Sequence, residues 1–520
     1  MKNVSTKKST IIVTLLTLIS AVLGFGRESY IAYAFGSTEF TDVYYVAGIV
    51  PDIVAGWIGY TLTKALIPSL KSELMVAQNS SKHLITASFY ITLVAATALT
   101  VLCYIYKANI LSLLAPNFHE QQYIVGTKML EIMVVAIIFS ALSGVLGGIH
   151  NSVEEFSYPA LTGIAYNFLY LGFIICFQPL FGIYALAYGL LVGIIGKFLV
   201  QFVPLVREKV LSLEFKFKHE KLPLVFLAMI PVFFSQIVTQ INQIVDRIIA
   251  TGLPPGEISN LNFASKLGLL PIGLIGASFA TTLYTRFVTY YLQKDIEQIK
   301  RLLTLALGWM VFLGMIISTG FYLYNKSLIS IFYYNGNFTI KDVVVASKPL
   351  AVYGGFSIIY LFIPVLVHFF YSRNEGRFVL LSSIVSVASN IVLSILLVKY
   401  LGIVGLVLAN GVAQTIYMLL LYGSSLKHLK WKLMDSAKEI LKLGLPGGGI
   451  FLVVVFLISH LWGEPALENK VMLIARGTIS LLSGVVGVFV YAQLDKTNLI
   501  NQSLNTVSTS IFQRIYRNRK

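Results

Sequence analysis

The chain has 520 residues, of which 57% are hydrophobic and only 12% are charged, and its mean hydropathy is +0.79. A soluble domain carries about a quarter charged residues, so this composition excludes a cytosolic enzyme, a disordered chain and a secreted disulfide scaffold. It indicates an all-α polytopic membrane protein. The net charge of +16 needs an explanation, because a basic chain can bind nucleic acid or can carry its charge in cytoplasmic loops.

Fourteen apolar runs are long enough to cross a bilayer, since a spanning helix needs about 20 such residues. The first run follows three lysines, but it is too long for a signal peptide and contains Arg27, so we predict an uncleaved span. In chain order the runs cover residues 9–34, 42–70, 82–106, 122–149, 158–178, 181–204, 223–250, 258–289, 301–324, 343–371, 377–398, 402–424, 439–461 and 471–492.

The segments between these runs are short, and their charges follow one pattern. With the N-terminus inside, the inner segments and adjoining span ends hold about five times as many lysines and arginines as the outer loops. This distribution accounts for most of the net charge and leaves no folded basic surface for nucleic acid. We therefore expect both termini in the cytoplasm, with the basic tail 493–520 lying against anionic lipid headgroups.

The chain resembles itself when it is shifted by 220 residues. This offset pairs Arg27 with Arg247, Gly36 with Gly256, Pro51 with Pro271, Gly56 with Gly276, Thr61 with Thr281 and Gly182 with Gly402. The repeating unit holds six spans, so the two copies have the same orientation and are expected to be related by a pseudo-two-fold axis along the membrane normal. We predict an N-terminal lobe over 1–206, a second lobe over 221–425, two extra transmembrane helices over 438–492 and the tail.

Charged residues inside the runs are candidates for a substrate site, because a charge within the bilayer is costly and faces a cavity or a partner. Arg27 and Lys266 lie deepest, and two cations lining one wet cavity suit a phosphate or pyrophosphate. The alternative is a set of ion pairs that fix packing, with Arg27 bound to Glu28 or Asp42. The candidates are Arg27, Glu28, Asp42, Asp52, Asp246, Arg247 and Lys266, with Lys64 and Arg286 near inner helix ends, where they could snorkel.

A second kind of site is indicated by Asp246, which lies near Asn242 in the seventh run. Asn390, Ser394 and Asn410 occur in the eleventh and twelfth runs. One carboxylate with several neutral oxygens suits a small hard cation. The alternative is ordinary hydrogen bonding between helices, or a local pairing of the aspartate with the arginine that follows it.

Several short motifs, in order and with similar spacing, resemble those of the MurJ (MviN) family over about residues 10–425. They are Ser20–Glu28, Phe35-Gly36, Thr41–Tyr44, Leu146–Asn151 with Tyr158-Pro159-Ala160, Val245–Arg247 with Leu253–Gly256, Leu270–Gly273 and Gly336–Thr339. The resemblance implies two six-helix lobes and two extra helices, in the superfamily that includes multidrug extruders and polysaccharide flippases. Family members flip lipid II, an undecaprenyl-pyrophosphate disaccharide-pentapeptide, for peptidoglycan assembly.

The resemblance also implies roles for particular residues. Arg27 matches a cavity arginine of the first span, Glu28 the acid after it, and Asp42 an aspartate of the second span. Lys266 stands in place of an arginine, which keeps the charge but loses the bidentate fork. The residues that resemble a sodium site of the family are Asp246, Asn390 and Asn410, with Ser394 in place of an acid.

Two departures from the family bear on the substrate: Ala21 and Ala55 stand where the family has arginines. We expect a flippase that moves lipid II across the bacterial cytoplasmic membrane by alternating access, without enzymatic chemistry, acting as a monomer among membrane lipids. Na⁺, H⁺ or the membrane potential would reset it, and no other cofactor is expected. The departures favour the alternative of another polyprenyl-linked glycan, such as a capsule, teichoic acid or exopolysaccharide unit. A multidrug extruder is the third reading, and the cationic cavity argues against it.

Overall fold

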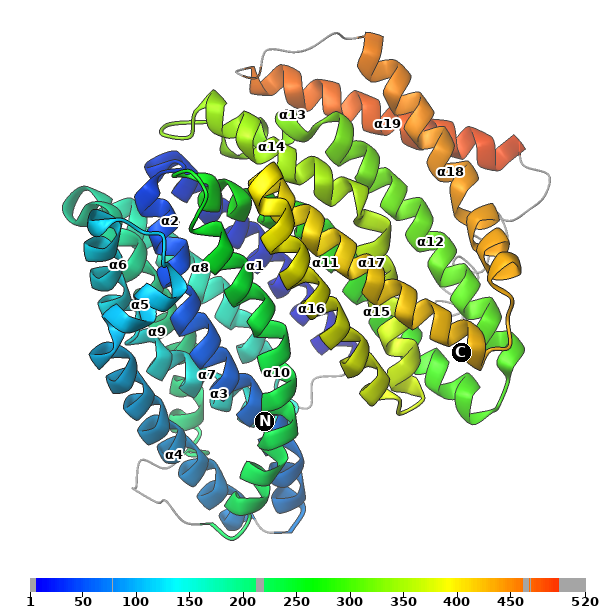
Figure 1. Ribbon diagram of the computed structural model, residues 1–520. Helices are drawn as coiled ribbons and strands as arrows, with labels where there is room; N and C mark the ends of the chain where they lie inside the picture. The colour runs from blue at the N-terminus through cyan, green and yellow to red at the C-terminus, as the bar shows by residue number, and fades with distance from the viewer. Residues whose placement is uncertain (1–5, 77, 212–218, 462–466, 468, 495–520) are drawn as a thin grey trace. The chain divides into compact units, whose positions relative to one another are not determined.

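The protein is described from a computed structural model, drawn in Figure 1. The structure describes residues 6–76, 78–211, 219–461, 467 and 469–494. These residues form helices joined by short connections, and the one β-type pairing among them is an isolated bridge between Asn335 and Phe338. The all-α fold predicted from composition is therefore confirmed.

The helices follow one another with few residues between them. They are α1 (Thr6–Phe35), α2 (Glu39–Ala47), α3 (Ile49–Val76), α4 (Gln78–Ile105), α5 (Lys107–Leu114), α6 (Glu120–Met133), α7 (Ala136–Ser152), α8 (Ser157–Phe181), the 3₁₀ turn η1 (Gly182–Tyr184), α9 (Ala185–Arg207), α10 (Leu222–Ala250), α11 (Glu257–Leu292), α12 (Ile296–Leu323), α13 (Asn325–Tyr333), α14 (Ile340–Gly355), α15 (Ser357–Ser372), α16 (Gly376–Leu401), α17 (Ile403–His428), α18 (Leu433–Leu461) and α19 (Lys470–Leu494).

Helices occupy all of the predicted apolar runs. Among the described residues, ten helical segments are long and apolar enough to cross a membrane, or eleven if α14 and α15, which meet at a bend of 50°, form one broken span. One of the ten is the segment Ser157–Arg207, 51 residues long, which contains both α8 and α9. The multi-pass character is confirmed, and the number of fourteen spans stays a prediction.

The backbone repeats with the same offset as the sequence. Gly182 ends α8 with φ 53° and ψ −132°, and Gly402 ends α16 with φ 54° and ψ −135°. Glu154 and Asn374 are separated by the same offset and have φ of 61° and 60°. A positive φ is uncommon for a residue other than glycine, so this agreement does not follow from shared apolar composition. The hairpins α8–α9 and α16–α17 are therefore structural counterparts.

The chain divides into two compact units, Met1–Ser259 with Asn335–Phe338, and Asn260–Tyr334 with Thr339–Lys520. Helix α10 belongs to the first unit, where it packs along α3. The sequence repeat instead places this helix at the start of the second lobe. The lobe boundaries inferred from the repeat stay a prediction.

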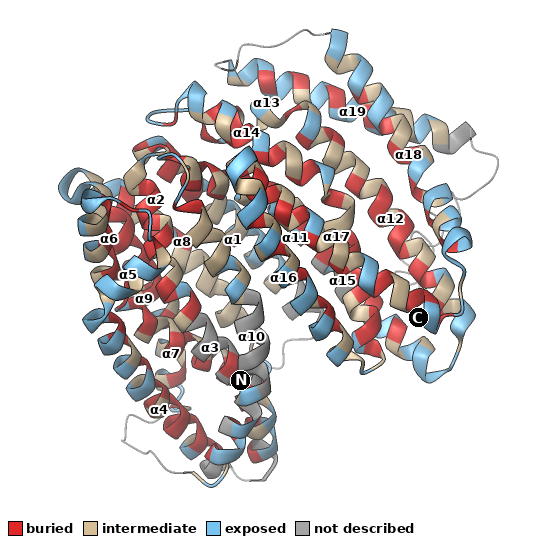
Figure 2. Ribbon diagram, in the orientation of Figure 1, coloured by how far each residue is buried: buried red, intermediate tan, exposed pale blue. Residues whose placement is uncertain are grey.

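Each unit has its own apolar core. In the first unit Leu66 of α3 and Leu146 of α7 are fully buried in a cluster that also draws on α4 and α9. In the second, Leu307 of α12 and Phe369 of α15 belong to a cluster with α11 and α17. Figure 2 shows buried and exposed residues alternating along single helices such as α4 and α12, so each helix turns one face to its core.

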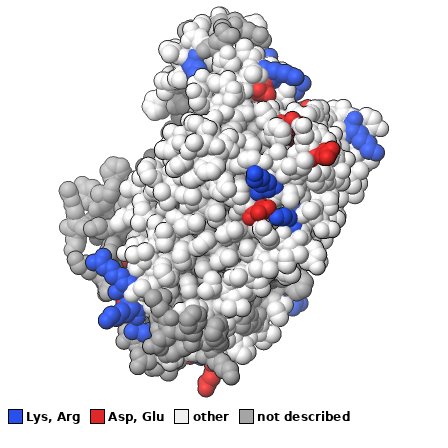
Figure 3. Space-filling model, turned by 90° about the vertical axis from the view of Figure 1, so that its left-hand side faces the viewer, with Lys and Arg blue, Asp and Glu red and all other residues white. Residues whose placement is uncertain are grey.

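The outer faces of the helices are also apolar. Exposed large side chains include Phe168, Leu180, Leu482 and Phe489. Figure 3 shows one face of the molecule, where uncharged residues cover most of the surface and charged side chains are few. An apolar exterior of this kind suits hydrocarbon, and helices satisfy their own backbone hydrogen bonds there.

Candidate functional site

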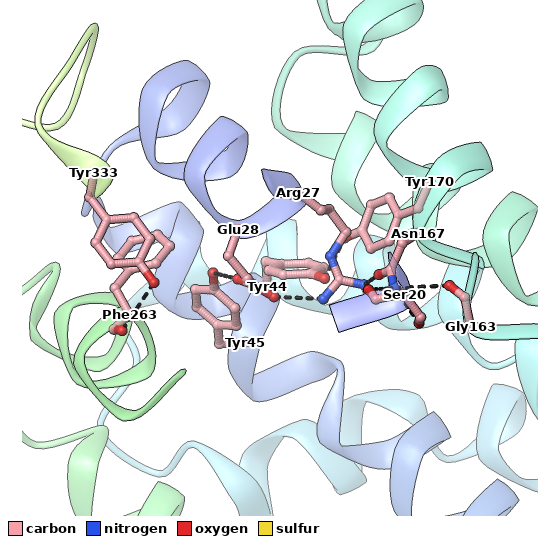
Figure 4. Close-up of polar contacts among 10 residues, drawn as sticks. All are labelled: Ser20, Arg27, Glu28, Tyr44, Tyr45, Gly163, Asn167, Tyr170, Phe263 and Tyr333. Atoms are coloured by element: carbon pink, nitrogen blue, oxygen red, sulfur yellow. Dashed lines mark hydrogen bonds and ion pairs between the residues drawn. The ribbon is translucent and has the colours of Figure 1, made fainter. Parts of the chain in front are cut away.

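Arg27 lies in a buried polar cluster formed by α1, α2 and α8 (Figure 4). Its exposed fraction is 9%, and that of Glu28 is 4%. Arg27 Nη2 donates to Glu28 Oε1 at 2.6 Å, and Nη1 donates to Asn167 Oδ1 at 3.0 Å. The Tyr45 hydroxyl donates to the other carboxylate oxygen of Glu28 at 3.0 Å. An adjacent acid thus balances the buried guanidinium and offsets the cost of removing it from water.

Tyrosine rings form the remaining walls of the cluster. The guanidinium carbon of Arg27 lies 5.1 Å from the ring centroid of Tyr166 and 4.9 Å from that of Tyr170, within the range of cation–π attraction. The Tyr170 hydroxyl is hydrogen-bonded to that of Tyr44. Arg27 Nε has no hydrogen-bond partner among the described residues. The guanidinium is therefore held in one orientation while one of its nitrogens stays available.

Asn167 positions the arginine by tying α8 to α1. Its Nδ2 donates to the carbonyl oxygens of Ser20, at 3.1 Å, and Gly163, at 2.9 Å. A Cβ at Gly24 would lie 3.2 Å from Nδ2, and a Cβ at Gly163 would collide with the Ser20 hydroxyl. Small residues thus let the two helices approach closely, as is common in membranes.

Asp42 forms a second polar centre in the same unit, with an exposed fraction of 3%. Its Oδ2 accepts from the Gly256 N–H at 2.6 Å, and its Oδ1 accepts from the N–H of Ser259 at 2.7 Å and from the Ser259 hydroxyl. Helix α11 begins at Glu257, so these N–H groups belong to a helix start, which carries partial positive charge. Arg247 adds an attractive electrostatic interaction with Asp42.

The tip of the α13–α14 connection, residues 335–338, also belongs to the first unit. Asn337 donates from its backbone N–H to the Tyr33 carbonyl at 2.9 Å and from Nδ2 to the Ala34 carbonyl at 2.7 Å. These carbonyls lie in the last turn of α1, where backbone carbonyls accept no hydrogen bonds from within the helix. Gly36 follows with φ of +65°, and a Cβ there would collide with the Asn337 carbonyl oxygen, so the junction requires glycine.

The structure groups four of the predicted substrate-binding residues within the first unit: Arg27 with Glu28, and Asp42 with Arg247. Of the two partners considered for Arg27, the structure shows Glu28. Lys266 lies in the second unit and is exposed, and the side chain of Lys64 lies outside the described residues. The assignment of these residues to substrate binding stays a prediction.

The residues predicted to bind a cation are divided between the two units. Asn390 and Ser394 are buried one turn apart on α16, which packs along α17. Asn410 of α17 accepts a hydrogen bond from the Tyr360 hydroxyl at 2.7 Å. Asp246 lies in α10 of the first unit. The joint binding of a cation by these four residues stays a prediction.

Sequence reasoning missed parts of the first cluster. Asn167, Tyr166 and Tyr170 give no signal, because uncharged polar residues are common in apolar helices. Lys197 of α9 was also missed, and it lies within electrostatic range of Asp52. Its charge within the sixth apolar run was the signal that could have found it.

A multi-pass helical fold with an internal repeat and a few charges gathered in buried clusters defines a membrane transporter. Comparison with known families identifies which one. The family model described as Lipid II flippase MurJ matches residues 31–469. The chain belongs to the MurJ family, and the family resemblance found in its motifs is confirmed.

Curated relatives agree with this assignment. A probable lipid II flippase MurJ of Buchnera aphidicola subsp. Schizaphis graminum is 29% identical over 438 residues, which cover 82% of this chain and 83% of the relative. The lipid II flippase MurJ of Burkholderia cenocepacia is 26% identical over 425 residues, or 78% of this chain and 81% of the relative.

Solved structures share the fold. A lipid II flippase MurJ in an inward closed conformation matches with a TM-score of 0.81 and 24% identity, covering 94% of this chain and 100% of that one. An inward-facing multidrug resistance transporter of the MATE family matches with a TM-score of 0.64 and 14% identity, over 81% of this chain and 98% of that one. These likenesses show that the chain shares the fold of both proteins.

Proposed function

We propose that this protein moves lipid II across the bacterial cytoplasmic membrane by alternating access, breaking no covalent bond. Membership of the MurJ family supports this function. So do the apolar exterior and the burial of the Arg27–Glu28 pair among apolar helices, because a carrier for a phosphate-bearing lipid needs cationic groups at membrane depth.

The observation that carries the proposal is the geometry around Arg27. Its guanidinium is buried, oriented by Asn167 and two tyrosine rings, and balanced by Glu28. Arginine matches phosphate oxygens through paired N–H groups. In the proposed cycle a pyrophosphate takes the place of the Glu28 carboxylate on the guanidinium, and the internal ion pair re-forms on release.

The contact of Asp42 with Gly256 and Ser259 is proposed to exist in only one of the two access states. A carboxylate against a helix start is a compact polar contact that can open without exposing apolar surface. Breaking it would release α2 from the start of α11 during transport.

A second candidate is a flippase for a different polyprenyl-linked glycan. Ala21 and Ala55 stand where the family has arginines, so this chain offers fewer cations to the headgroup. A multidrug extruder is less well supported, because Arg27 would repel cationic drugs.

We further propose that a cation or the membrane potential resets the carrier. Asp246, Asn390, Ser394 and Asn410 supply the oxygen ligands that Na⁺ prefers, and Asp246 alone would serve for H⁺. The excess of positive charge in alternate segments supports cytoplasmic termini. The protein is proposed to act as a monomer.

Complementation tests the function directly. The chain should restore growth to a bacterial strain depleted of its own lipid II flippase, and Arg27→Ala should not. Failure of the wild-type chain despite correct membrane insertion would contradict the lipid II assignment. Restoration of a strain lacking a capsule or teichoic acid flippase would then establish the second candidate.

A further inference from the structure

A buried arginine outside the Arg27 cluster lies in α19, in the second unit. Arg476 has an exposed fraction of 8%, and its Nη2 donates to the Ser459 carbonyl of α18 at 2.6 Å. Its Nε and Nη1 have no hydrogen-bond partner among the described residues. A guanidinium offers five N–H donors, and leaving buried donors unmet is costly. Most of the hydrogen-bonding capacity of Arg476 is therefore unused within the described protein.

A second polar group lies one turn further along the same face of α19. Ser480 is fully buried, and its hydroxyl has no hydrogen-bond partner among the described residues. Gly484 follows after another turn, and a Cβ there would lie 2.6 Å from the Phe451 ring and 2.8 Å from Val455 of α18. Residues four apart lie above one another on a helix, so Arg476 and Ser480 face α18 together.

Tyr324, where α12 meets α13, adds a third group at this interface. It packs with Phe451 and Val455 in a small buried cluster, and its hydroxyl likewise has no partner among the described residues. A guanidinium and two hydroxyls with unmet capacity thus line the junction of α12, α18 and α19. Nearly all buried polar atoms in proteins have hydrogen-bond partners, so three groups at one junction that lack partners among the described residues indicate a ligand.

The surroundings favour an anion that arrives from the lipid. Arg476 lies six residues after Lys470, the first residue of α19, which places it about 9 Å along the helix from that end. No described carboxylate forms an ion pair with it. Exposed apolar side chains cover the outer faces of both helices, among them Val453, Leu457, Leu481, Leu482 and Val485.

We propose that the junction of α12, α18 and α19 binds the phosphate of an anionic phospholipid. Arg476 donates to the phosphate from Nη1, Ser480 and Tyr324 donate hydroxyl hydrogen bonds, and the acyl chains lie along the exposed apolar faces of α18 and α19. A guanidinium donates strong, charge-assisted hydrogen bonds to phosphate oxygens, and the site lies within reach of the headgroups at the α18–α19 end. This site is separate from the Arg27 cluster and does not depend on the transported substrate.

Thermal unfolding of the full chain in detergent, after lipid removal, tests the proposal. Dioleoylphosphatidylglycerol should raise the unfolding midpoint, whereas dioleoylglycerol, with the same chains and no phosphate, should not. An equal shift with dioleoylglycerol would show that the phosphate is not recognised. An equal shift with inorganic phosphate would show that the ligand is not lipid-borne. Either result overturns the proposal.

Variants assign the effect to the site. In Arg476→Gln the lipid concentration that gives half of the shift should rise about tenfold or more, whereas Arg286→Gln, at an exposed arginine of the same unit, should match the wild type. Because Arg476→Gln can impair folding, Tyr324→Phe and Ser480→Ala serve as milder variants, each expected to raise that concentration about threefold. A wild-type response in both milder variants would overturn the proposal.

The connection between α18 and α19 provides the last control. Glu464 and Glu468 lie there, outside the described residues. The double variant Glu464→Gln, Glu468→Gln should keep the full response to phosphatidylglycerol. If it instead destabilises the lipid-free protein as much as Arg476→Gln does, the guanidinium pairs with these acids and binds no lipid.

Discussion

Asp42 and Ser259, separated by 217 residues in the chain, are joined by two hydrogen bonds, one from the serine backbone N–H at 2.7 Å and one from its hydroxyl. The carboxylate also accepts the Gly256 N–H, so three donors converge on one buried acid. A negative charge placed at a helix start gains from the helix dipole as well as from the individual bonds.

Replacing the acid should therefore weaken both folding and transport. Asp42→Asn keeps the shape but turns an amide N–H toward backbone donors, and we expect it to lower the free energy of unfolding by about 1–3 kcal/mol. Thermal unfolding in detergent measures the first effect and complementation the second. Glu39→Gln, on the same helix, is the matched control, because Glu39 pairs with the half-exposed His119 at 2.9 Å. Equal behaviour of the two variants would show that the charge of Asp42 has no special role.

The geometry of Arg27 predicts that charge alone does not suffice. Arg27→Lys keeps one positive charge, but an ammonium cannot contact Asn167 and Glu28 as a planar fork. We expect at least about a tenfold loss in the rate of lipid II flipping by this variant in reconstituted vesicles, which corresponds to about 1.4 kcal/mol. Lys71→Ala removes an exposed ion pair with Glu154 and should leave the rate unchanged. A wild-type rate of flipping by Arg27→Lys would show that the guanidinium is not required for transport.

Gly256 should tolerate no side chain. Its φ is +86°, and a Cβ there would collide with the Ser37 carbonyl oxygen. We expect Gly256→Ala to cost more than about 1 kcal/mol, because both backbone strain and the collision act against it. Gly172→Ala is the control, since Gly172 lies in α8 with nothing within 4 Å of a Cβ, and alanine there should be neutral or stabilising. The comparison is made by thermal unfolding, and an unperturbed Gly256→Ala would refute the steric argument.

The predicted orientation is open to chemical labelling. Lys294 and Lys326 are both exposed, and they fall in an inner and an outer segment respectively. In a variant whose two cysteines are replaced, Lys326→Cys should react with a membrane-impermeant maleimide on intact cells. Lys294→Cys should react only after the membrane is permeabilised. The reverse labelling pattern would show that the predicted orientation in the membrane is wrong.

The sequence predicted the helices and the internal repeat correctly, because both follow from the distribution of apolar residues and glycines along the chain. The apolar runs become helices because a bilayer allows little else, and Gly182 and Gly402 show that the repeat extends to backbone angles. It also selected Arg27 and Asp42, because charge inside an apolar run is rare. It could not decide that Arg27 pairs with Glu28 while Asp42 binds a helix start, since both pairings satisfy the same charges and only three-dimensional packing separates them.

The local contacts were the least predictable part. Asn167 and Tyr170 come into contact with the arginine only because α8 approaches α1 through small residues. Arg476 was not selected either, although its charge lies in the last apolar run. Its burial against α18 depends on helix packing, which a linear pattern does not contain.

The shared turn at Gly182 and Gly402 points to how this molecule arose. A half-length ancestral gene that was duplicated would leave two copies of one hairpin, free to diverge in side chains while the chain reversal was kept. In that correspondence Tyr170, which lies against the guanidinium, is the counterpart of Asn390, which lies in the proposed cation site. The same position of the repeated hairpin therefore carries an aromatic side chain in one copy and an amide in the other.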